Sequence, residues 1–420
     1  MYKNLTKTDA QIYKLIRQEI NRQDGGLVLI ASENFASPVV LETLGSPLTN
    51  KYSEGYPGKR YYGGNQFIDQ IENLAIERAK KLFLPKSQWP NWQVNVQPYS
   101  GSPANMEVYF SLLEPGDKIM GMSLTQGGHL THGHPVNLSG KIFKAISYGV
   151  DPKTHLLDFK KITQLAKKNK PKLIICGATA YARQIDFEAF GRIAKTVKAV
   201  LVADISHIAG LVAAKQHPSP FTNCDVVTTT THKTLRGPRG AIIFAKNELA
   251  EKINKMVFPG MQGGPHDNNI AAMAVAFQEA LRPSFKKYAR QVILNAKALS
   301  KALKTSGFNL ITGSTDNHLI LIDLRNFNLG GKEAEKLLEA VGIYVNRNTI
   351  PYDPNPPFKP SGLRIGTPAL TTRGMKAKEM ILIGQMMAQI IKNPQDQKIK
   401  KTVQQTVKKL TKKFPLYKGL

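Results

Sequence analysis

The chain has little cysteine and no long hydrophobic run. Only Cys176 and Cys224 occur among its 420 residues, and both lie in apolar stretches that are typical of strands. Two separated cysteines argue against a disulfide framework and a cysteine-based zinc site, and they favour a reducing compartment. No apolar stretch is long enough to cross a bilayer, and the start at Met1–Thr6 lacks the apolar core of a signal peptide. We therefore expect a cytoplasmic protein with no membrane partner.

Acidic residues are also scarce, with 30 Asp and Glu against 58 Lys and Arg and a formal net charge of +28. Such an imbalance bears on binding partners and not on the fold. The basic residues are scattered and no aromatic-rich RNA-recognition motif accompanies them, so a nucleic-acid partner is an alternative that the charge alone suggests. They are densest in Lys398–Lys418, where apolar residues recur at helical spacing. This pattern favours an amphipathic helix with a solvated lysine face.

The first two thirds of the chain alternate between strand-like and helix-like segments. The expected strands are Gly26–Ala31, Asn95–Pro98, Lys118–Gly121, Leu173–Cys176, Val200–Asp204, Asp225–Thr230 and Ala241–Ala245. The expected helices are Thr8–Arg22, Ile68–Leu84, Pro103–Leu113, Lys160–Lys168 and Phe187–Val197. Such alternation predicts an α/β fold in which helices cover both faces of a mainly parallel sheet.

The pattern changes after about residue 280. Helices are expected at Ser284–Ser306, Gly331–Val341 and Ala377–Lys392, and strands at His318–Asp323 and Gly342–Val345. These segments predict a second, smaller α+β domain. The expected organisation is an N-terminal helical arm at residues 1–25, a large domain at 26–280 and a small C-terminal domain at 281–420.

One long segment, Leu48–Asn65, has no periodicity and is rich in tyrosine and glycine. A loop of this length inside a compact chain is usually functional or disordered. The aromatic residues of its central part, Lys51–Gly64, argue against disorder. We therefore expect a functional loop here.

Lys233 is the strongest candidate for a reactive residue. It follows Asp225–Thr230, whose β-branched residues predict a buried strand, and three chain-breaking residues follow at Gly237, Pro238 and Gly240. A lysine at the end of a buried strand is partly desolvated, which lowers its pKa and frees a neutral amine for Schiff-base chemistry. In an arbitrary lysine-rich chain the commoner role is that of a surface lysine. The four threonines and the histidine before Lys233, and the two arginines after it, favour the reactive role.

Asp204 ends another apolar strand, Val200–Asp204. Ligands of open parallel sheets bind at the carboxyl ends of the strands, where both Asp204 and Lys233 fall. A carboxylate there could bind a metal, cap the next helix or pair with a pyridinium nitrogen. No second Asp or Glu is near, which disfavours a metal, although His207 leaves that role open. The pair suits pyridoxal 5′-phosphate (PLP), because the lysine forms the imine and the aspartate keeps the ring nitrogen protonated.

Two further segments are candidates for the same site. In Ser100-Gly101-Ser102-Pro103 a strand ends and a helix begins, so hydroxyl and backbone N–H groups could hold a phosphate, although an ordinary helix cap uses the same residue types. Gln126–His134 contains three histidines, but their spacing does not place them on one helix face, and no carboxylate completes a metal site. We expect one histidine to stack on a cofactor ring, the others to be structural, and no resident metal.

Taken together, the chain from about residue 5 to Tyr417 resembles the serine hydroxymethyltransferase family. The matching motifs are Leu29–Asn34, Lys51–Gly64, Val96–Ser102, Gly127–Gly133, Asp204–His207, Thr228–Gly240, Phe258–Pro265 and Gly362–Pro368. Many long motifs in one order are far more specific than any one of them. The resemblance implies a PLP-dependent transferase of fold type I, whose large domain has a mainly parallel seven-stranded sheet and whose smaller C-terminal domain is α+β.

The resemblance also implies roles for individual residues. The catalytic residues would be Lys233, Glu54, Asp204, His129, Tyr62 and Thr230. The cofactor would be bound by Ser100, Gly101, Ser102, His129, Thr179, Asp204, His207, His232 and Lys233, joined by Tyr52 and Gly264 of the partner subunit. The amino-acid substrate would be bound by Ser32, Tyr52, Glu54, Tyr62 and Arg364. The folate would be bound by Tyr61, Leu124, Gly128, Leu130 and Asn348.

The implied reaction is the reversible conversion of L-serine and tetrahydrofolate to glycine and 5,10-methylene-tetrahydrofolate. The alternative enzyme is a folate-independent aldolase of β-hydroxy amino acids such as threonine and allo-threonine, which would use Lys233 in the same way. Gly127–His129 and Asn348 favour the folate enzyme, because an aldolase needs no pterin slot. The implied assembly is a homodimer with shared active sites, and a tetramer stays open. Thr179 departs from the serine that the family often has there, and Leu84–Gln93 is longer and more aromatic than expected.

Overall fold

The computed structural model describes residues 3–417. The chain forms two compact units: a larger one from Asn34 to Arg290, and a smaller one that combines the residues up to Glu33 with those from Gln291 onward. The outermost residues of the predicted arm and C-terminal domain, 1–2 and 418–420, lie outside the described residues, and so does Lys418 of the basic segment.

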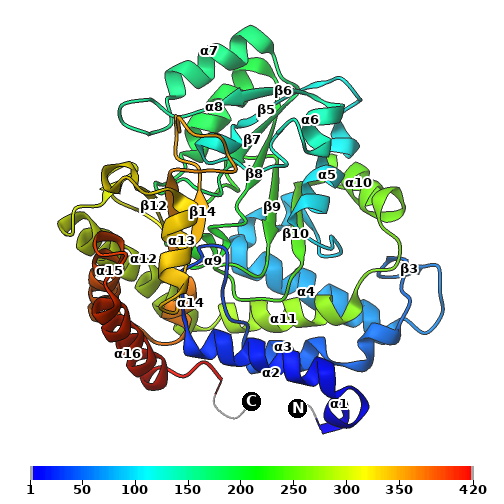
Figure 1. Ribbon diagram of the computed structural model, residues 1–420. Coiled ribbons are helices and arrows are strands. Elements are labelled where there is room, and N and C mark those ends of the chain that lie inside the picture. The colour runs from blue at the N-terminus through cyan, green and yellow to red at the C-terminus, as the bar shows by residue number, and fades with distance from the viewer. Residues whose placement is uncertain (1–2, 418–420) are drawn as a thin grey trace. The chain divides into compact units, whose positions relative to one another are not determined.

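A seven-stranded sheet forms the centre of the larger unit (Figure 1). Its strands in spatial order are β4 (Trp92–Asn95), β10 (Ala241–Lys246), β9 (Val226–Thr230), β8 (Val200–Asp204), β7 (Leu173–Gly177), β5 (Lys118–Met122) and β6 (Lys144–Tyr148). Only β10 within this sheet of the described chain runs antiparallel to its neighbours. The predicted mainly parallel sheet is therefore confirmed.

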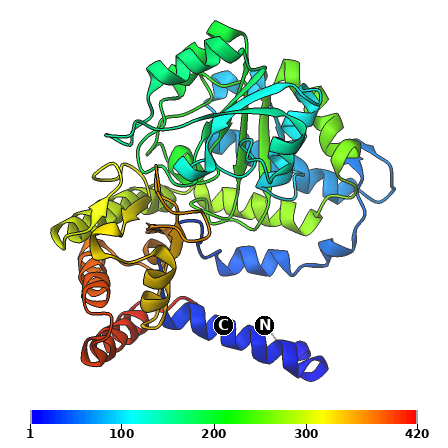
Figure 2. The ribbon, with the colours of Figure 1, turned by 45° about the horizontal axis from the view of Figure 1, so that its top comes forward.

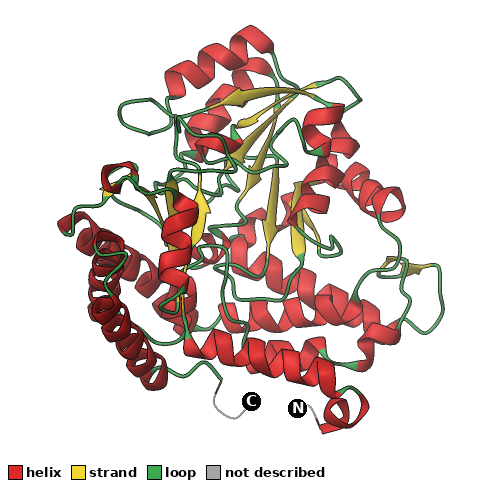
Figure 3. Ribbon diagram, in the orientation of Figure 1, coloured by secondary structure: helices red, strands yellow, loops and turns green. Residues whose placement is uncertain are grey.

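Helices cover both faces of this sheet, as Figure 3 shows. They are α3 (Pro38–Leu44), α4 (Gln66–Phe83), α5 (Gly101–Leu112), α6 (Leu138–Ile142), α7 (Phe159–Asn169), α8 (Phe187–Val197), α9 (Ala209–Ala213), α10 (Asn247–Lys255) and α11 (Asp267–Ala280). Short helical turns are η1 (Pro47–Asn50), η2 (Lys86–Asn91), η3 (Leu124–Gln126) and η4 (Met256–Met261). Every residue of β7 and β9 is buried, so neither strand shows the polar–apolar alternation of a half-exposed strand. β7 is a continuous apolar run, and β9 consists of β-branched residues.

The larger unit differs from the sequence predictions in several elements. The strand β6 and the helices α3, α6, α9, α10 and α11 were not predicted, and the first strand is displaced. The first strand is Trp92–Asn95 and not Asn95–Pro98, because residues 92–95 pair with β10 and bury Trp92. The helix α11 was missed because it is apolar on most of its surface and therefore shows no amphipathic period. The segment Lys51–Gly64 is largely irregular, as predicted, and contains one short hairpin, β2 (Gly55–Tyr56) with β3 (Lys59–Arg60).

The smaller unit contains an antiparallel sheet and packed helices. Its sheet, in spatial order, is β11 (Asn309–Leu310), β12 (Leu319–Asp323), β15 (Gly362–Gly366) and β14 (Asn346–Asn348). A parallel pair joins β1 (Leu27–Val28) to β13 (Ile343–Tyr344). The helices are α1 (Lys3–Thr8), α2 (Ala10–Gly25), α13 (Gly331–Glu339), α14 (Pro368–Thr372), α15 (Ala377–Lys392) and α16 (Gln397–Lys413), with a short turn η5 (Arg325–Phe327). The long helix α12 (Pro283–Thr305) begins in the larger unit and ends in the smaller one.

The two ends of the smaller unit's chain are joined by Arg373. Figure 2 shows α2 extending away from the other elements of this unit, and α2 has no buried residue. The guanidinium of Arg373 is buried and donates to the carbonyl oxygens of Asp24, Gly26 and Phe414. The arginine thus holds the end of α2 and the end of α16 to one point. The predicted basic amphipathic helix is present as α16, which buries Val403, Val407, Leu410 and Thr411.

Within residues 3–417, the structure has no helix with both the length and the apolar character that a membrane crossing requires.

Candidate active site

The end of β9 presents Lys233 as the sequence predicted. The strand is buried throughout, and Lys233 follows three residues later in a half-buried position. Its Nζ donates to Thr230 Oγ1 at 3.3 Å. Its backbone carbonyl accepts a hydrogen bond from Asn34 Nδ2 at 2.8 Å, and the same amide nitrogen bonds to the Tyr288 hydroxyl at 2.8 Å. The turn that carries the amine is therefore fixed by contacts outside its own segment.

His232, beside it, has an imidazole nitrogen that no partner satisfies. Its Nδ1 is buried without a hydrogen-bond partner among the described residues. Burial lowers the pKa of His232 to about 3, and the nearby charges of Lys233 and Arg239 act in the same direction. The imidazole is therefore neutral here. An anion placed at this nitrogen would both satisfy it and offset the neighbouring positive charges.

Asp204 ends β8 and is held on several sides. Its carboxylate accepts hydrogen bonds from Asn105 Nδ2 at 2.9 Å and from the backbone N–H of Ser206 at 3.0 Å. His132 Nε2 lies 3.3 Å from Asp204 Oδ2. Burial alone would raise the pKa of Asp204, but the hydrogen bond with His132 and the charges of His132 and His129 outweigh it and hold that pKa well below its usual range. The fold therefore keeps a buried carboxylate ionised.

A second layer of polar side chains fixes these partners. Thr228 Oγ1 donates to Asn105 Oδ1 at 2.7 Å, while Asn105 Nδ2 also contacts Thr131 Oγ1 at 2.9 Å. Thr131 Oγ1 in turn lies 2.7 Å from His129 Nδ1. The sequence analysis missed Asn105 and Thr228. Thr228 could have been found, because it lies two residues before Thr230 and therefore on the same face of the strand.

Two predictions for the histidine-containing loop Gln126–His134 are wrong. His132 was predicted to be merely structural, but it contacts the carboxylate of Asp204. The statement that no carboxylate accompanies the histidines was wrong as well, because one ligand atom from each of His129, His132 and Asp204 lies within 4.8 Å of the others. Sequence spacing could not reveal this, since Asp204 is 72 residues from His132. Asp204 already accepts bonds from Asn105 and Ser206, which suits it to pair with one further cationic N–H donor.

The start of α5 has the features of an anion site. Ser100 is the N-cap residue, yet its hydroxyl makes no capping hydrogen bond. A Cβ on Gly101 would lie 2.7 Å from Thr230 Cγ2, so only glycine fits beside the end of β9. Ser102 is exposed in the first turn, where backbone N–H groups lack helical partners. His207, three residues after Asp204, is buried, and its backbone carbonyl accepts a hydrogen bond from Thr234 Oγ1 at 3.0 Å.

These groups fit PLP as a cofactor. The glycine-lined helix start and the unsatisfied His232 nitrogen suit a phosphate, the ionised Asp204 suits a pyridinium, and Lys233 supplies an amine. The phosphate, the ring nitrogen and the aldehyde of PLP would therefore each meet a suitable group in this structure.

The loop Lys51–Gly64 brings together four of the predicted residues. The rings of Tyr52 and Tyr62 pack edge to face with centroids 5.1 Å apart. The negative charge of Glu54 raises the pKa of Tyr62, which places these two side chains close together. A Cβ on Gly263 would meet Glu54 Oε1 at 3.1 Å, and one on Gly264 would meet the Tyr52 ring at 3.3 Å. Tyr52, Glu54, Tyr62 and Gly264 thus form one cluster within the larger unit.

The predicted folate residues occupy three places. Leu124 lies in η3, and the exposed Leu130 lies in the glycine-rich loop that follows. Gly128, between them, lies against backbone, because a Cβ there would lie 1.9 Å from the Met122 carbonyl oxygen. The carbonyl of Gly128 accepts a hydrogen bond from Thr179 Oγ1 at 2.6 Å. Tyr61 packs against Phe258 with ring centroids 5.6 Å apart. Asn348 lies on β14 of the smaller unit.

Arg364, on β15 of the smaller unit, is a largely buried cation. Its Nε donates to Asn346 Oδ1 at 3.2 Å, and its Nη2 donates to Ser32 Oγ at 3.4 Å. Burial lowers the pKa of Arg364 to about 10, so the guanidinium stays charged at neutral pH while being poorly solvated. Asn346 was missed, because its place opposite Arg364 depends on the register of two strands. The pair Arg364 and Ser32 was predicted, and the structure brings it together.

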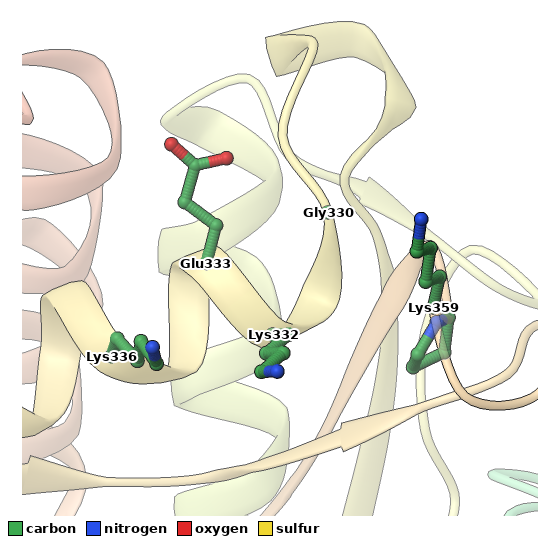
Figure 4. Close-up of a pocket in the computed structure, with 6 residues that line it drawn as sticks. Gly330, Lys332, Glu333, Lys336 and Lys359 are labelled. Atoms are coloured by element: carbon green, nitrogen blue, oxygen red, sulfur yellow. The ribbon is translucent and has the colours of Figure 1, made fainter.

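A separate hollow of about 400 Å³ lies at the start of α13 in the smaller unit (Figure 4). Of the described residues, those that line it are Gly330, Lys332, Glu333, Lys336, Lys359 and Pro360. Glu333 points away from Lys332 and Lys336 in this view. The residues predicted for the active site are not among its lining residues, so it is distinct from the candidate site.

Comparison with known proteins decides the family. The model of the family described as serine hydroxymethyltransferase matches residues 5–387 of the chain. The chain belongs to the serine hydroxymethyltransferase family. It is 56% identical over 417 residues to the serine hydroxymethyltransferase of Cyanothece sp., an alignment that covers 99% of this chain and 96% of the relative. The identity is 54% over 417 residues for the Microcystis aeruginosa protein of the same name, with the same coverage of both chains. It is 56% over 417 residues for a Prochlorococcus marinus protein of that name, with 99% and 97% covered.

Membership in the serine hydroxymethyltransferase family confirms the predicted resemblance. The family implies the PLP fold of type I, and the seven-stranded sheet agrees with it. The near-complete coverage of relatives named serine hydroxymethyltransferase supports a PLP-dependent one-carbon transferase over the folate-independent aldolase.

Proposed function

We propose that the chain catalyses the reversible conversion of L-serine and tetrahydrofolate to glycine and 5,10-methylene-tetrahydrofolate. The observation that carries this proposal is the ionised, buried Asp204 at the end of β8 and the amine of Lys233 beyond the end of the adjacent strand β9. In a member of this family, such a pair serves amino-acid chemistry on PLP.

Lys233 would hold PLP through its amine, and Ser100, Gly101, Ser102 and His232 would hold its phosphate. When bound, PLP supplies an electron sink for the carbanion that forms when the Cα–Cβ bond of serine breaks. Asp204 would keep a proton on the ring nitrogen, which its depressed pKa favours. His129 would stack on the ring and His207 would contact its hydroxyl, while Thr179 and Thr230 would complete the pocket.

The amino-acid substrate would be oriented by its carboxylate. Arg364 would bind that carboxylate through two parallel N–H bonds, a geometry that an ammonium cannot offer. The partial burial of Arg364 supports this role, since an incoming anion would compensate its lost hydration. Ser32, Tyr52 and Tyr62 would line the same substrate site.

Glu54 would exchange a proton with the hydroxymethyl oxygen of serine. A carboxylate can do so only if it lies within hydrogen-bond reach of that oxygen, which makes its placement decisive. Tetrahydrofolate would then accept the one-carbon unit in a slot lined by residues of several segments. These folate-binding residues are Tyr61, Leu124, Gly128, Leu130 and Asn348.

The active form would be a homodimer in which Tyr52, Glu54 and Gly264 of the partner subunit complete each site. The cluster that Tyr52, Glu54 and Gly264 form within one chain supports this, because a partner could then deliver them as one rigid group. A tetramer built from two such dimers fits the same arrangement. We further propose three functional regions: the helical arm at residues 1–25, the PLP-binding domain at 26–280 and the small domain at 281–420.

The test of this function is Glu54→Gln. The amide keeps the size and hydrogen bonding of the carboxylate but cannot exchange a proton, so tetrahydrofolate-dependent cleavage of serine should fall by roughly 100-fold or more. Folate-independent cleavage of allo-threonine should fall much less, because its retro-aldol release needs less help from this carboxylate. Both reactions would be followed at saturating PLP.

Glu77→Gln is the matched control, because Glu77 is an exposed carboxylate on α4 that pairs only locally, with Lys81. It should leave both reactions unchanged. An equal loss of both reactions in Glu54→Gln would show that Glu54 supports the site generally and has no folate-specific role.

A further inference from the structure

The loop that carries Glu54 has little regular structure to hold it. Within Lys51–Gly64 the only regular pairing described is the short hairpin that matches Gly55 with Arg60 and Tyr56 with Lys59. Glu54 itself is half-buried, and its backbone carbonyl accepts from the Tyr61 N–H at 3.0 Å. A side chain that must place a proton to within a few tenths of an ångström therefore needs further support.

Arg60, on β3 of the same loop, supplies that support. Its side chain is only 4% exposed. One nitrogen, Nη1, donates to the carbonyl oxygen of Ser53 at 2.9 Å and to that of Gly55 at 2.8 Å. These are the two residues that flank Glu54. A single guanidinium nitrogen therefore fixes the backbone on both sides of the proposed acid–base residue.

The other nitrogens of Arg60 anchor it to α4. Nε donates to Asp69 Oδ1 at 2.8 Å, and Nη2 donates to Glu72 Oε2 at 2.6 Å. Glu72 Oε1 accepts from Gln97 Nε2 at 2.9 Å, and that same nitrogen donates to the Gly55 carbonyl at 2.9 Å. We call Arg60 and Gln97, which both donate to the Gly55 carbonyl, the clamp. The clamp is thus anchored to α4 and to the segment after β4.

The hairpin itself is built for this approach. Gly55 has a φ of +97°, and a Cβ there would lie 2.3 Å from the Lys59 carbonyl oxygen. Any other residue would push the two strands of the hairpin apart and carry Arg60 away from the Ser53 and Gly55 carbonyls. Ser53, the residue before Glu54, is held by its side chain as well: its buried hydroxyl donates to the carboxylate of Asp267 at 2.8 Å.

We propose that Arg60 is a positioning residue for Glu54: it sets the place of the Glu54 carboxylate and so controls the tetrahydrofolate-dependent reaction without touching substrate. This inference rests on the proposed function of Glu54. Lysine cannot replace Arg60, because one ammonium has three donors at a single point and cannot reach two carbonyls and two carboxylates spread around a planar fork.

The experiment compares Arg60→Lys, Glu54→Gln and the double variant as PLP-loaded enzymes. Arg60→Lys should lower the kcat of tetrahydrofolate-dependent serine cleavage by roughly 10- to 100-fold, as expected for a misplacement of about 1 Å. Cleavage of allo-threonine should change by less than about threefold. In the Glu54→Gln background the Arg60 change should add no more than about a twofold loss, because the carboxylate that it positions is gone.

Two further measurements separate positioning from general stability. Hydrogen exchange of the backbone amides of residues 51–64 should become faster in Arg60→Lys, while the exchange of the β9 amides stays as in the wild type. Arg78→Lys is the matched control, because Arg78 lies on α4, the helix that anchors Arg60, and like Arg60 donates to a backbone carbonyl, that of Ala274. It should leave both reactions unchanged.

Gln97→Ala removes the second donor to the Gly55 carbonyl and tests the same clamp if Arg60→Lys does not fold. It should show the same selective loss at a smaller size, roughly 3- to 10-fold. A parallel loss of both reactions in Arg60→Lys, or a loss that adds fully to that of Glu54→Gln, would overturn the proposal. If Glu54→Gln itself is not selective, the function assigned to Glu54 fails and the role of Arg60 falls with it; if Glu54→Gln is selective and Arg60→Lys is not, only the role of Arg60 is wrong.

Discussion

Asp204 in the larger unit and Arg364 in the smaller one are both buried charges, yet the protein treats them differently. Asp204 is held by Asn105, His132 and the Ser206 N–H, and its pKa is pushed further toward the charged form. Arg364 has long hydrogen bonds of 3.2 and 3.4 Å to two neutral side chains, and burial shifts its pKa against the charged form. The surroundings of Asp204 therefore favour its charged form, whereas burial disfavours the charged form of Arg364.

The difference matches the lifetimes of the two proposed ligands. A cofactor that stays bound can be met by a fixed, fully bonded partner, because the network never has to release it. A substrate that arrives and leaves is better met by a charge that burial has stripped of hydration, because binding of the substrate then relieves a desolvation cost that is already present. The comparison predicts that changing Asp204 affects turnover and that changing Arg364 affects substrate affinity.

The largest effect should come from Asp204→Asn. Loss of the carboxylate removes the proton on the ring nitrogen, so kcat should fall by roughly two orders of magnitude or more, or at least about 2.7 kcal/mol of transition-state stabilisation. The KM for serine and the affinity for PLP should change far less. Steady-state kinetics and PLP titration would measure both.

Asp225→Asn is the control, because Asp225 is a carboxylate just before β9, bonded to Lys246 Nζ at 2.7 Å and to the Leu201 N–H at 2.9 Å. It should keep its turnover. If Asp204→Asn turned over at a near-normal rate, Asp204 would have no part in the mechanism.

A smaller effect of a different kind is expected for Arg364→Lys. The bidentate pair with the substrate carboxylate would be lost, so the KM for serine should rise by roughly 10- to 100-fold while kcat falls much less. Arg347→Lys, on the neighbouring strand, changes an exposed arginine that pairs with Glu335 and should have no effect. A drop in kcat at unchanged KM would mean that Arg364 acts in the transition state and does not merely bind the carboxylate.

The sequence predicted the framework of the fold well where the periodic signal was strong. The bounds of β8, α8 and α15 agree with the structure to the residue, because β8 is a short apolar run that ends on Asp204 and the two helices are amphipathic. The helix α11 was missed because it is apolar nearly all round. The bounds of β4 depend on its pairing with β10, which is about 150 positions later in the chain and which no local pattern encodes.

The residues of the candidate site likewise fall into those that the sequence predicted and those that it missed. Lys233 and Asp204 could be found because each directly follows or ends a buried strand, and the carboxyl ends of such strands gather at one edge of a sheet. Asn105, Asn346 and Gln97 were missed because their roles depend on contacts with residues 18 to 99 positions away. Sequence therefore identified the groups with chemistry to perform, while the groups that hold them in place required the fold.

The central claim is that Lys233 holds the cofactor. The most direct test is to reduce the purified PLP-loaded protein with borohydride, digest it and locate the PLP-modified lysine by mass spectrometry. The account predicts a yellow protein whose reduced adduct lies on Lys233, and a Lys233→Ala variant that has no reducible cofactor link. Recovery of the adduct on any other lysine, or an undiminished adduct in Lys233→Ala, would contradict it.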